Sequence, residues 1–103
     1  MKLIYLDRAR PDLAWLRIYY GSVFPEGAAH ASARYIKAID ILQRNPYIGR
    51  SIGQDDLRRL PIPRTPFTVF YRVIKDRIEI VRIWDQRADP KKLEFNEEAA
   101  VFA

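Results

Sequence analysis

The stretch LRRLPIPRTPFTVFYRVIKDRIEIVRIWDQRADP, residues 57–90, decides the fold of this chain. Apolar and polar residues alternate through much of it, which is the pattern of β-strands with one buried face. Pro61 and Pro63 bound a first strand, and Lys75 with Asp76 makes a tight connection between a second strand and a third. The stretch therefore predicts a meander of three antiparallel strands.

Positive charge lies inside these strands as well as between them. Residues 58–87 contain seven arginines and one lysine against three carboxylates, a surplus of five that equals the formal net charge of the whole chain. Strands that carry arginine among leucine, valine and isoleucine need one face that is not core. We expect this face to suit an anionic partner, through Arg58, Arg72, Arg82 and Arg87.

The period of two assigns side chains to the two faces of the longer strands. In the second strand it groups Phe67, Val69, Tyr71 and Val73. In the third it groups Ile78, Ile80, Arg82 and Trp84 against Glu79, Val81 and Ile83. Neither face is wholly polar, so we expect helices to cover one side of the sheet and the other side to be partly exposed.

The residues before the meander predict one short strand and two helices. Residues 2–6 form an apolar run typical of a strand. Asp7 offers a cap to a following helix with Pro11 in its first turn, and apolar spacings of three and four over 12–20 predict that this helix is amphipathic. Gly21 is a natural stop, and a second helix is expected over 25–44 with alanines that allow close packing. The expected fold is α/β of the α+β type: a short N-terminal strand, an antiparallel two-helix hairpin and the meander in one sheet, with the helices on one face.

Length and composition limit the classes of function. The 103 residues are enough for one domain, which we place at 1–90, with a tail at 91–103 that is helical or ordered by a partner. Cysteine is absent, which excludes disulfides and thiol catalysis, and scattered carboxylates with one histidine predict no metal site and no cofactor. No segment suggests a membrane span, so we expect a cytoplasmic protein.

Four strings in the chain resemble motifs of one known superfamily. They are LQRNPYIG at 42–49, LRRLP at 57–61, FYRV at 70–73 and RIWDQRADP at 82–90. In this order and spacing they resemble the RelE/ParE superfamily of toxins from bacterial type II toxin–antitoxin systems, over residues 2–90. RelE-like members are ribosome-dependent mRNA endonucleases, whereas ParE-like members have no known enzymatic activity of their own and poison DNA gyrase.

The long hairpin and the PYIGR and RIW strings resemble the ParE branch, and Asp85 stands where many relatives have histidine. An ionised aspartate repels phosphate and lacks the proton exchange of histidine near neutral pH. The resemblance thus implies a gyrase poison that a cognate antitoxin neutralises by wrapping the hairpin and the sheet. It also implies that operator DNA is bound only through the antitoxin. Partner-binding candidates are the helix-one aromatics Trp15, Tyr19 and Tyr20.

Two other functions stay open from the sequence. An mRNA endonuclease acting on the ribosome would use Arg58, Tyr71, Arg82, Asp85 and Arg87. A degenerate member would keep only antitoxin binding or a regulatory role. We also expect Tyr71 to lie in the core and Asp85 to pair with Arg87 or with a strand arginine. Arg58 either binds an anion or pairs with an aspartate, for which the candidates are Asp55, Asp56 and Asp85.

Overall fold

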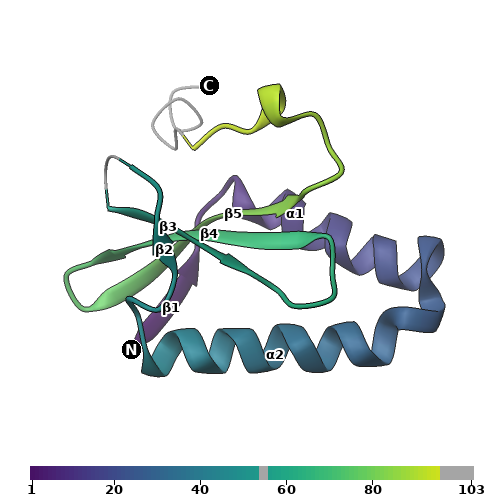
Figure 1. The fold of residues 1–103 in the computed structure, drawn as a ribbon, viewed down its shortest axis with the longest axis horizontal. Coiled ribbons are helices and arrows are strands. Elements are labelled where there is room, and N and C mark those ends of the chain that lie inside the picture. Colours follow the sequence, from purple (N-terminus) through teal and green to yellow (C-terminus); the bar gives the residue numbers. More distant parts are fainter. Residues whose placement is uncertain (54–55, 96–103) are drawn as a thin grey trace.

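The computed structural model of the chain describes residues 1–53 and 56–95. Figure 1 shows a sheet with two helices, which makes the fold α+β. The elements in chain order are β1 (Lys2–Tyr5), α1 (Ala9–Ile18), a π-helical turn (Tyr19–Val23), a 3₁₀ turn (Pro25–Gly27), α2 (Ala28–Arg44), β2 (Arg50–Ser51), β3 (Leu57–Pro61), β4 (Phe67–Ile74), β5 (Arg77–Asp85) and a second 3₁₀ turn (Pro90–Lys92).

The sheet has five strands in the order β1-β5-β4-β3-β2. β1 runs parallel to β5, with Lys2 opposite Arg77 and Tyr5 opposite Ile80, while the other pairs are antiparallel. The predicted three-stranded antiparallel meander is therefore only the centre of a mixed sheet. The prediction was wrong in this detail because β2 has two residues, too few to show a period, and because the partner of a short strand is not encoded in its own pattern.

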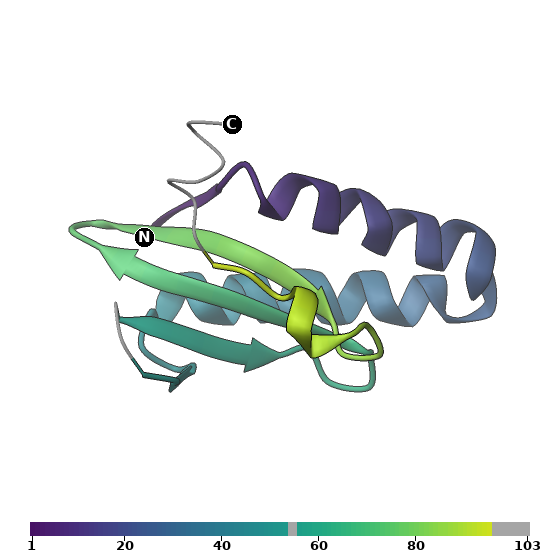
Figure 2. The same cartoon turned by 90° about the horizontal axis from the view of Figure 1, so that it is seen from above.

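Both helices pack on one face of this sheet (Figure 2). α1 begins at Ala9 with Pro11 in its first turn, as predicted, where a missing amide is tolerated. Arg8, and not the expected Asp7, takes the N-cap position. The helical path continues past Gly21 as the π-helical turn, in which the Phe24 amide donates to the Tyr19 carbonyl at 2.7 Å. The wider turn sends Tyr20 into the core and leaves Tyr19 partly exposed.

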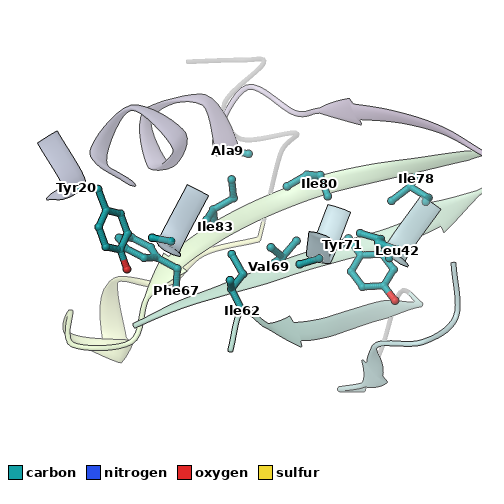
Figure 3. Packing of buried hydrophobic residues seen from close by; sticks show 12 residues of the cluster. Ala9, Tyr20, Leu42, Ile62, Phe67, Val69, Tyr71, Ile78, Ile80 and Ile83 are labelled. Atoms are coloured by element: carbon teal, nitrogen blue, oxygen red, sulfur yellow. The ribbon is translucent and has the colours of Figure 1, made fainter. Parts of the chain in front are cut away.

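The core lies between the helices and the sheet (Figure 3). Its largest fully buried side chains are Tyr71 and Phe67 from β4 and Leu42 from α2. The other strand members of the cluster are Val69, Ile78, Ile80 and Ile83, its other helical members are Ala9, Tyr20, Ala31 and Ala38, and Ile62 joins it from the residue just after β3. Ala31 and Ala38 of α2 are buried in this cluster, whereas the sequence predicted that alanines of this helix allow close approach to the first helix.

A β-bulge changes the faces in β5. Phe70 pairs with Arg82 and the next residue, Tyr71, pairs with Ile80, so Val81 is an extra residue. The predicted alternation is wrong beyond this point: Ile83 joins the core, and Arg82 lies opposite Phe70 on the other face of the sheet. No glycine or proline marks the bulge in the sequence, and it becomes visible only through the pairing with β4.

The chain after β5 returns across the sheet face opposite the helices (Figure 2). The ring of Phe95 packs against Phe70 with the ring centroids 5.0 Å apart. Between β5 and Phe95, Asp89 caps the 3₁₀ turn at Pro90–Lys92, because its carboxylate accepts a hydrogen bond from the Lys91 amide at 3.0 Å. The predicted tail at 91–103 lies outside the described residues from 96 onward. In the part of the chain that is described, no helix has the length and apolarity needed to span a membrane.

Candidate functional site

The end of β5 and the outer part of α1 form a cluster of aromatic and charged side chains. The indole Nε1 of Trp15 donates to Oδ2 of Asp85 at 3.0 Å. The guanidinium of Arg87 donates to both oxygens of the same carboxylate, at 2.9 and 2.6 Å, and also lies 4.2 Å from the centroid of the Tyr19 ring. The predicted ion pair between Asp85 and Arg87 is thus confirmed. We call Trp15, Tyr19, Asp85 and Arg87 the strand-end cluster.

A shallow pocket of about 480 Å³ opens beside this cluster. Its lining comes from α1, from the end of β5 and from the residues just after it: Asp12, Trp15, Ile83, Trp84, Asp85, Arg87 and Ala88. Trp15 is exposed and Arg87 half-exposed, so both reach a molecule that docks here. Large aromatic and arginine side chains of this kind dominate the binding energy of many protein interfaces.

The electrostatics of the cluster hold Asp85 in its ionised form. The hydrogen bonds from the Arg87 side chain lower the pKa of Asp85 to about 2, against a smaller opposing effect of burial, and the Trp15 indole adds to the lowering. The same hydrogen bonds raise the pKa of Arg87. A carboxylate with so low a pKa is a poor proton acceptor near neutral pH.

Arg82 forms an ion pair with Asp12, a residue that the sequence did not single out. Its Nε and one terminal nitrogen donate to the two carboxylate oxygens of Asp12 at 2.7 and 3.0 Å, and another donates to the Glu94 carbonyl at 3.0 Å. Asp12 also accepts from the Ile83 amide at 2.9 Å. Only one signal pointed to Asp12, a carboxylate in the first turn of a helix, and that position has an ordinary explanation in the helix dipole.

Arg72 belongs to a second charged group on the same sheet face. Its Nε donates to the buried Glu79 carboxylate at 2.8 Å, and Arg77 donates to the other oxygen at 3.0 and 2.6 Å. Burial raises the pKa of Glu79, but the hydrogen bonds from the two arginines outweigh it and lower the pKa overall. The charge of Arg72 is therefore balanced within the sheet.

Arg58 lies at the other end of the sheet and holds the loop after α2. One terminal nitrogen donates to the carbonyls of Tyr47 and Gly49 at 3.1 and 2.7 Å. Neither Asp56 nor Asp85 pairs with it, and the third predicted partner, Asp55, lies outside the described residues.

Tyr71 is fully buried, as expected, and burial raises its pKa. Its hydroxyl accepts a hydrogen bond from the Gly49 amide at 2.8 Å.

The structure therefore separates the residues that the sequence grouped as one anionic-partner face. Arg72, Arg82 and Arg87 each pair with a carboxylate, and Arg58 is bonded to backbone carbonyls. The strand-end cluster instead brings together Arg87 and two of the partner-binding candidates, whereas Tyr20 packs in the core against Phe67. Within residues 1–53 and 56–95 no group of three or more histidine and carboxylate side chains is placed to hold a metal ion.

A second pocket, of about 510 Å³, opens between β1, α1 and α2. Leu13, Leu16 and Ala28 supply apolar lining, and Tyr5 and Tyr35 join their hydroxyl groups by a hydrogen bond inside it. Burial, together with this hydrogen bond, raises the pKa of Tyr35. The pocket is mostly apolar with a few polar groups, which is the usual make-up of a groove that accepts side chains of a partner.

Comparisons with known proteins give consistent results. The family model described as ParE toxin of type II toxin-antitoxin system, parDE, matches residues 3–90. The solved structure of the chromosomal ParDE TA system from P. aeruginosa contains a chain that is 30% identical, with a TM-score of 0.63 over 81% of this chain and 92% of that chain. No curated protein matches.

Proposed function

Because this chain belongs to the ParE family of toxins from type II toxin–antitoxin systems, we propose that it poisons DNA gyrase and is held inactive by a cognate antitoxin. Gyrase as the target extends the family membership, as does neutralisation by the antitoxin. With this target the toxin acts in the cytoplasm. It uses no cofactor, because it acts by binding an enzyme rather than by a reaction of its own.

The observation that carries the choice of gyrase over RNA is the state of Asp85. Its carboxylate accepts two hydrogen bonds from the Arg87 side chain and one from Trp15, and its pKa falls to about 2. Cleavage of RNA without a metal requires a group that takes a proton from a 2′-hydroxyl. Asp85 is unsuited to this role, and its negative charge disfavours a phosphate beside it.

Other residues of the endonuclease hypothesis are buried or bonded to other parts of the protein. Tyr71 is fully buried, so its hydroxyl does not reach an RNA strand, and burial raises its pKa. Arg82 is bonded to Asp12 through both carboxylate oxygens, and Arg58 to the loop after α2. An endonuclease would have to break these contacts before the arginines could hold a phosphate.

For the antitoxin, the pocket between β1 and the two helices and the strand-end cluster are the surfaces that fit best. The first is a pocket with mostly apolar lining, and a second pocket opens beside the cluster; an extended or helical segment gains affinity by placing side chains in such grooves. Trp15 lines the pocket beside the strand-end cluster, where its ring lies near that of Tyr19, and Tyr20 lines the pocket between β1 and the two helices. Binding of operator DNA is assigned to the antitoxin and not to the toxin.

The test places two assays side by side. The purified toxin is added to DNA gyrase with relaxed plasmid, and separately to a translation reaction with ribosomes and a defined mRNA. We expect inhibited supercoiling and an accumulation of cleaved plasmid, no cuts in the mRNA, and recovery of gyrase when the protein encoded beside the toxin gene is added first. Codon-positioned cuts without gyrase inhibition would establish the endonuclease instead, and silence in both assays would point to a degenerate member.

The antitoxin surface is tested with a matched pair of variants. Trp15→Ala should weaken antitoxin binding by about tenfold or more, because an exposed tryptophan beside a pocket is a typical hot spot. Ile36→Ala is the control, since Ile36 is exposed in the middle of α2 and lines neither groove. Equal affinities for the two variants, measured by calorimetry on folded proteins, would remove Trp15 from the interface.

A further inference from the structure

The segment that leaves α2 exposes three large apolar side chains close together in the sequence. Tyr47 is 64% exposed, Ile48 50% and Ile52 38%. None of the three lines the pockets beside α1 described above. Grouped apolar exposure of this kind is uncommon on a soluble domain and marks a surface that binds something. We call residues 45–52, which include the short strand β2, the exit loop.

The exit loop is held in place by contacts at its centre, of which the hydrogen bond between Gly49 and Tyr71 is buried. Arg58 donates to the carbonyls of Tyr47 and Gly49, and its guanidinium carbon lies 5.1 Å from the centroid of the Tyr47 ring. The Gly49 amide donates to the Tyr71 hydroxyl, which Figure 3 shows at the border of the core. A Cβ atom on Gly49 would lie 2.5 Å from that hydroxyl oxygen and 2.9 Å from the Arg59 carbonyl oxygen. The loop therefore packs too tightly here for any residue but glycine.

This clamp keeps the apolar side chains of the loop exposed. The backbone is bonded on its inner side, and the Ile52 amide continues the attachment by donating to the Leu57 carbonyl at 3.0 Å. A loop ordered before binding loses little conformational entropy when a partner docks, so its exposed groups convert efficiently into affinity.

We propose that the exit loop is the surface through which this toxin contacts DNA gyrase, with Tyr47, Ile48 and Ile52 as apolar anchors and Arg50 as their cationic neighbour. The inference rests on the proposed function and names the contact surface for it. The matching site on gyrase is an apolar hollow with acidic side chains at its rim.

Shape favours a folded target over the antitoxin as the occupant. The exit loop presents its side chains outward and is already ordered, which suits insertion into a preformed hollow. An antitoxin segment that folds on binding gains most from grooves such as the two beside α1. The seventeen residues of α2, about 25 Å in length, also separate the loop from the turn that joins the helices (Figure 1).

Charge favours an acidic rim on the partner. Residues 44–59 contain four arginines and two aspartates. Arg44 is paired with Asp40, but Arg50 is exposed, and no carboxylate among residues 1–53 and 56–95 lies within ion-pairing distance of it. An exposed cation next to apolar anchors, with no ion pair to the described residues, raises the rate of encounter with an acidic protein surface.

The experiment compares two double variants with the same change in charge. Ile48→Glu with Arg50→Glu alters the exit loop, and Ile36→Glu with Lys37→Glu alters the exposed side of α2, where Ile36 is 63% exposed. We expect the loop variant to need about tenfold more protein or greater for half-maximal inhibition of supercoiling, as for loss of an interface hot spot. The α2 variant should match the wild type. Thermal unfolding checks that each variant is folded, and Arg50→Glu alone replaces the loop variant if that does not fold.

Each outcome has a definite meaning. If the wild type inhibits gyrase and the loop variant inhibits equally well, the inference fails while the proposed function stands. If the wild type does not inhibit gyrase, both fail. Sedimentation velocity and antitoxin titration complete the set: a loop variant that loses self-association or antitoxin affinity by the same factor as gyrase inhibition assigns the loop to a second copy or to the antitoxin, and overturns the inference.

Discussion

The carboxylate of Asp12 in α1 receives two hydrogen bonds from the guanidinium of Arg82 in β5, at 2.7 and 3.0 Å. It also accepts from the Ile83 amide, which points away from β4 at the edge of the sheet. β1 covers this edge only as far as Ile80, whose carbonyl accepts from the Leu6 amide. Asp12 thus takes the place of a strand residue beyond the end of β1 and fixes the start of α1 against β5.

Removal of either partner of this pair should destabilise the fold strongly. Asp12→Ala removes the carboxylate that pairs with the Arg82 guanidinium and accepts from the Ile83 amide, in a place where both side chains of the pair are nearly buried, and we expect a loss of about 3 kcal/mol in the free energy of unfolding. Arg82→Met should lose a similar amount. The double variant should lose clearly less than the sum of the two, because neither charge is then left alone. Urea unfolding measures all three, and additive losses would contradict the coupling.

Asp85 should contribute to stability in a pH-dependent way. Its pKa in the folded protein, about 2, lies below its ordinary value of 3.8. Its stabilising effect is therefore complete above pH 4 and is lost as the pH falls through about 2, because the unfolded chain takes up the proton first. Asp85→Asn keeps an acceptor for Trp15 but removes the charge. We expect it to lower the free energy of unfolding at pH 7 by at most about 2 kcal/mol.

The same variant should also change the shape of the acid transition. Between pH 4 and pH 2 its stability should fall less steeply than that of the wild type. Some slope should persist, because the pKa of Glu79 is lowered as well. Chemical unfolding at a series of pH values compares the two proteins, and parallel curves would show that the ion pair with Arg87 has no net effect.

The hydroxyl of Tyr71 should order the exit loop. Tyr71→Phe keeps the ring in the core but removes the acceptor of the buried Gly49 amide, which should lower the free energy of unfolding by about 1–2 kcal/mol. The Gly49 amide should then exchange with solvent faster in hydrogen-exchange measurements. Tyr47→Phe is the matched control, since it removes an exposed hydroxyl on the same loop. If Gly49 stays protected in Tyr71→Phe, the clamp does not depend on this bond.

The bulge should be dispensable for the faces of β5. Deletion of Val81 would leave Arg82 opposite Phe70 and Ile83 opposite Val69, so Ile83 would still face the helices. We expect the deletion to keep a cooperative unfolding transition at a lower midpoint, because the buried Val81 side chain is lost. Val81→Ala keeps the residue count and should lose about 2 kcal/mol, as for a shortened buried side chain. Circular dichroism during heating compares the two, and loss of the cooperative transition in the deletion would show that the bulge is needed for the register.

Much of the fold was predictable from local patterns. The apolar spacings predicted both helices, and alternation with prolines predicted β3, β4 and β5 close to their observed bounds. The site was predictable only in pieces. Arg87 and Asp85 are two residues apart on an exposed strand end, so their pairing could be expected, whereas Trp15 reaches the same carboxylate from seventy residues away. That contact depends on how α1 crosses the sheet, which no local pattern describes.

The sequence by itself determined which segments become helices and strands, because periodicity and turn residues act over a few neighbouring positions. It also carried the motifs that place the chain among the ParE toxins. Only the tertiary structure decided which arginines are bonded to other groups of the protein and which remain available to a partner. The bulge at Val81 turns Arg82 to the face opposite the core and Asp12 meets it there, while Arg58 is used to clamp the exit loop. Contacts between segments that are distant in the sequence decide whether an arginine can bind a partner. Most arginines of these strands are used in such contacts, so the strands serve mainly to hold the fold together.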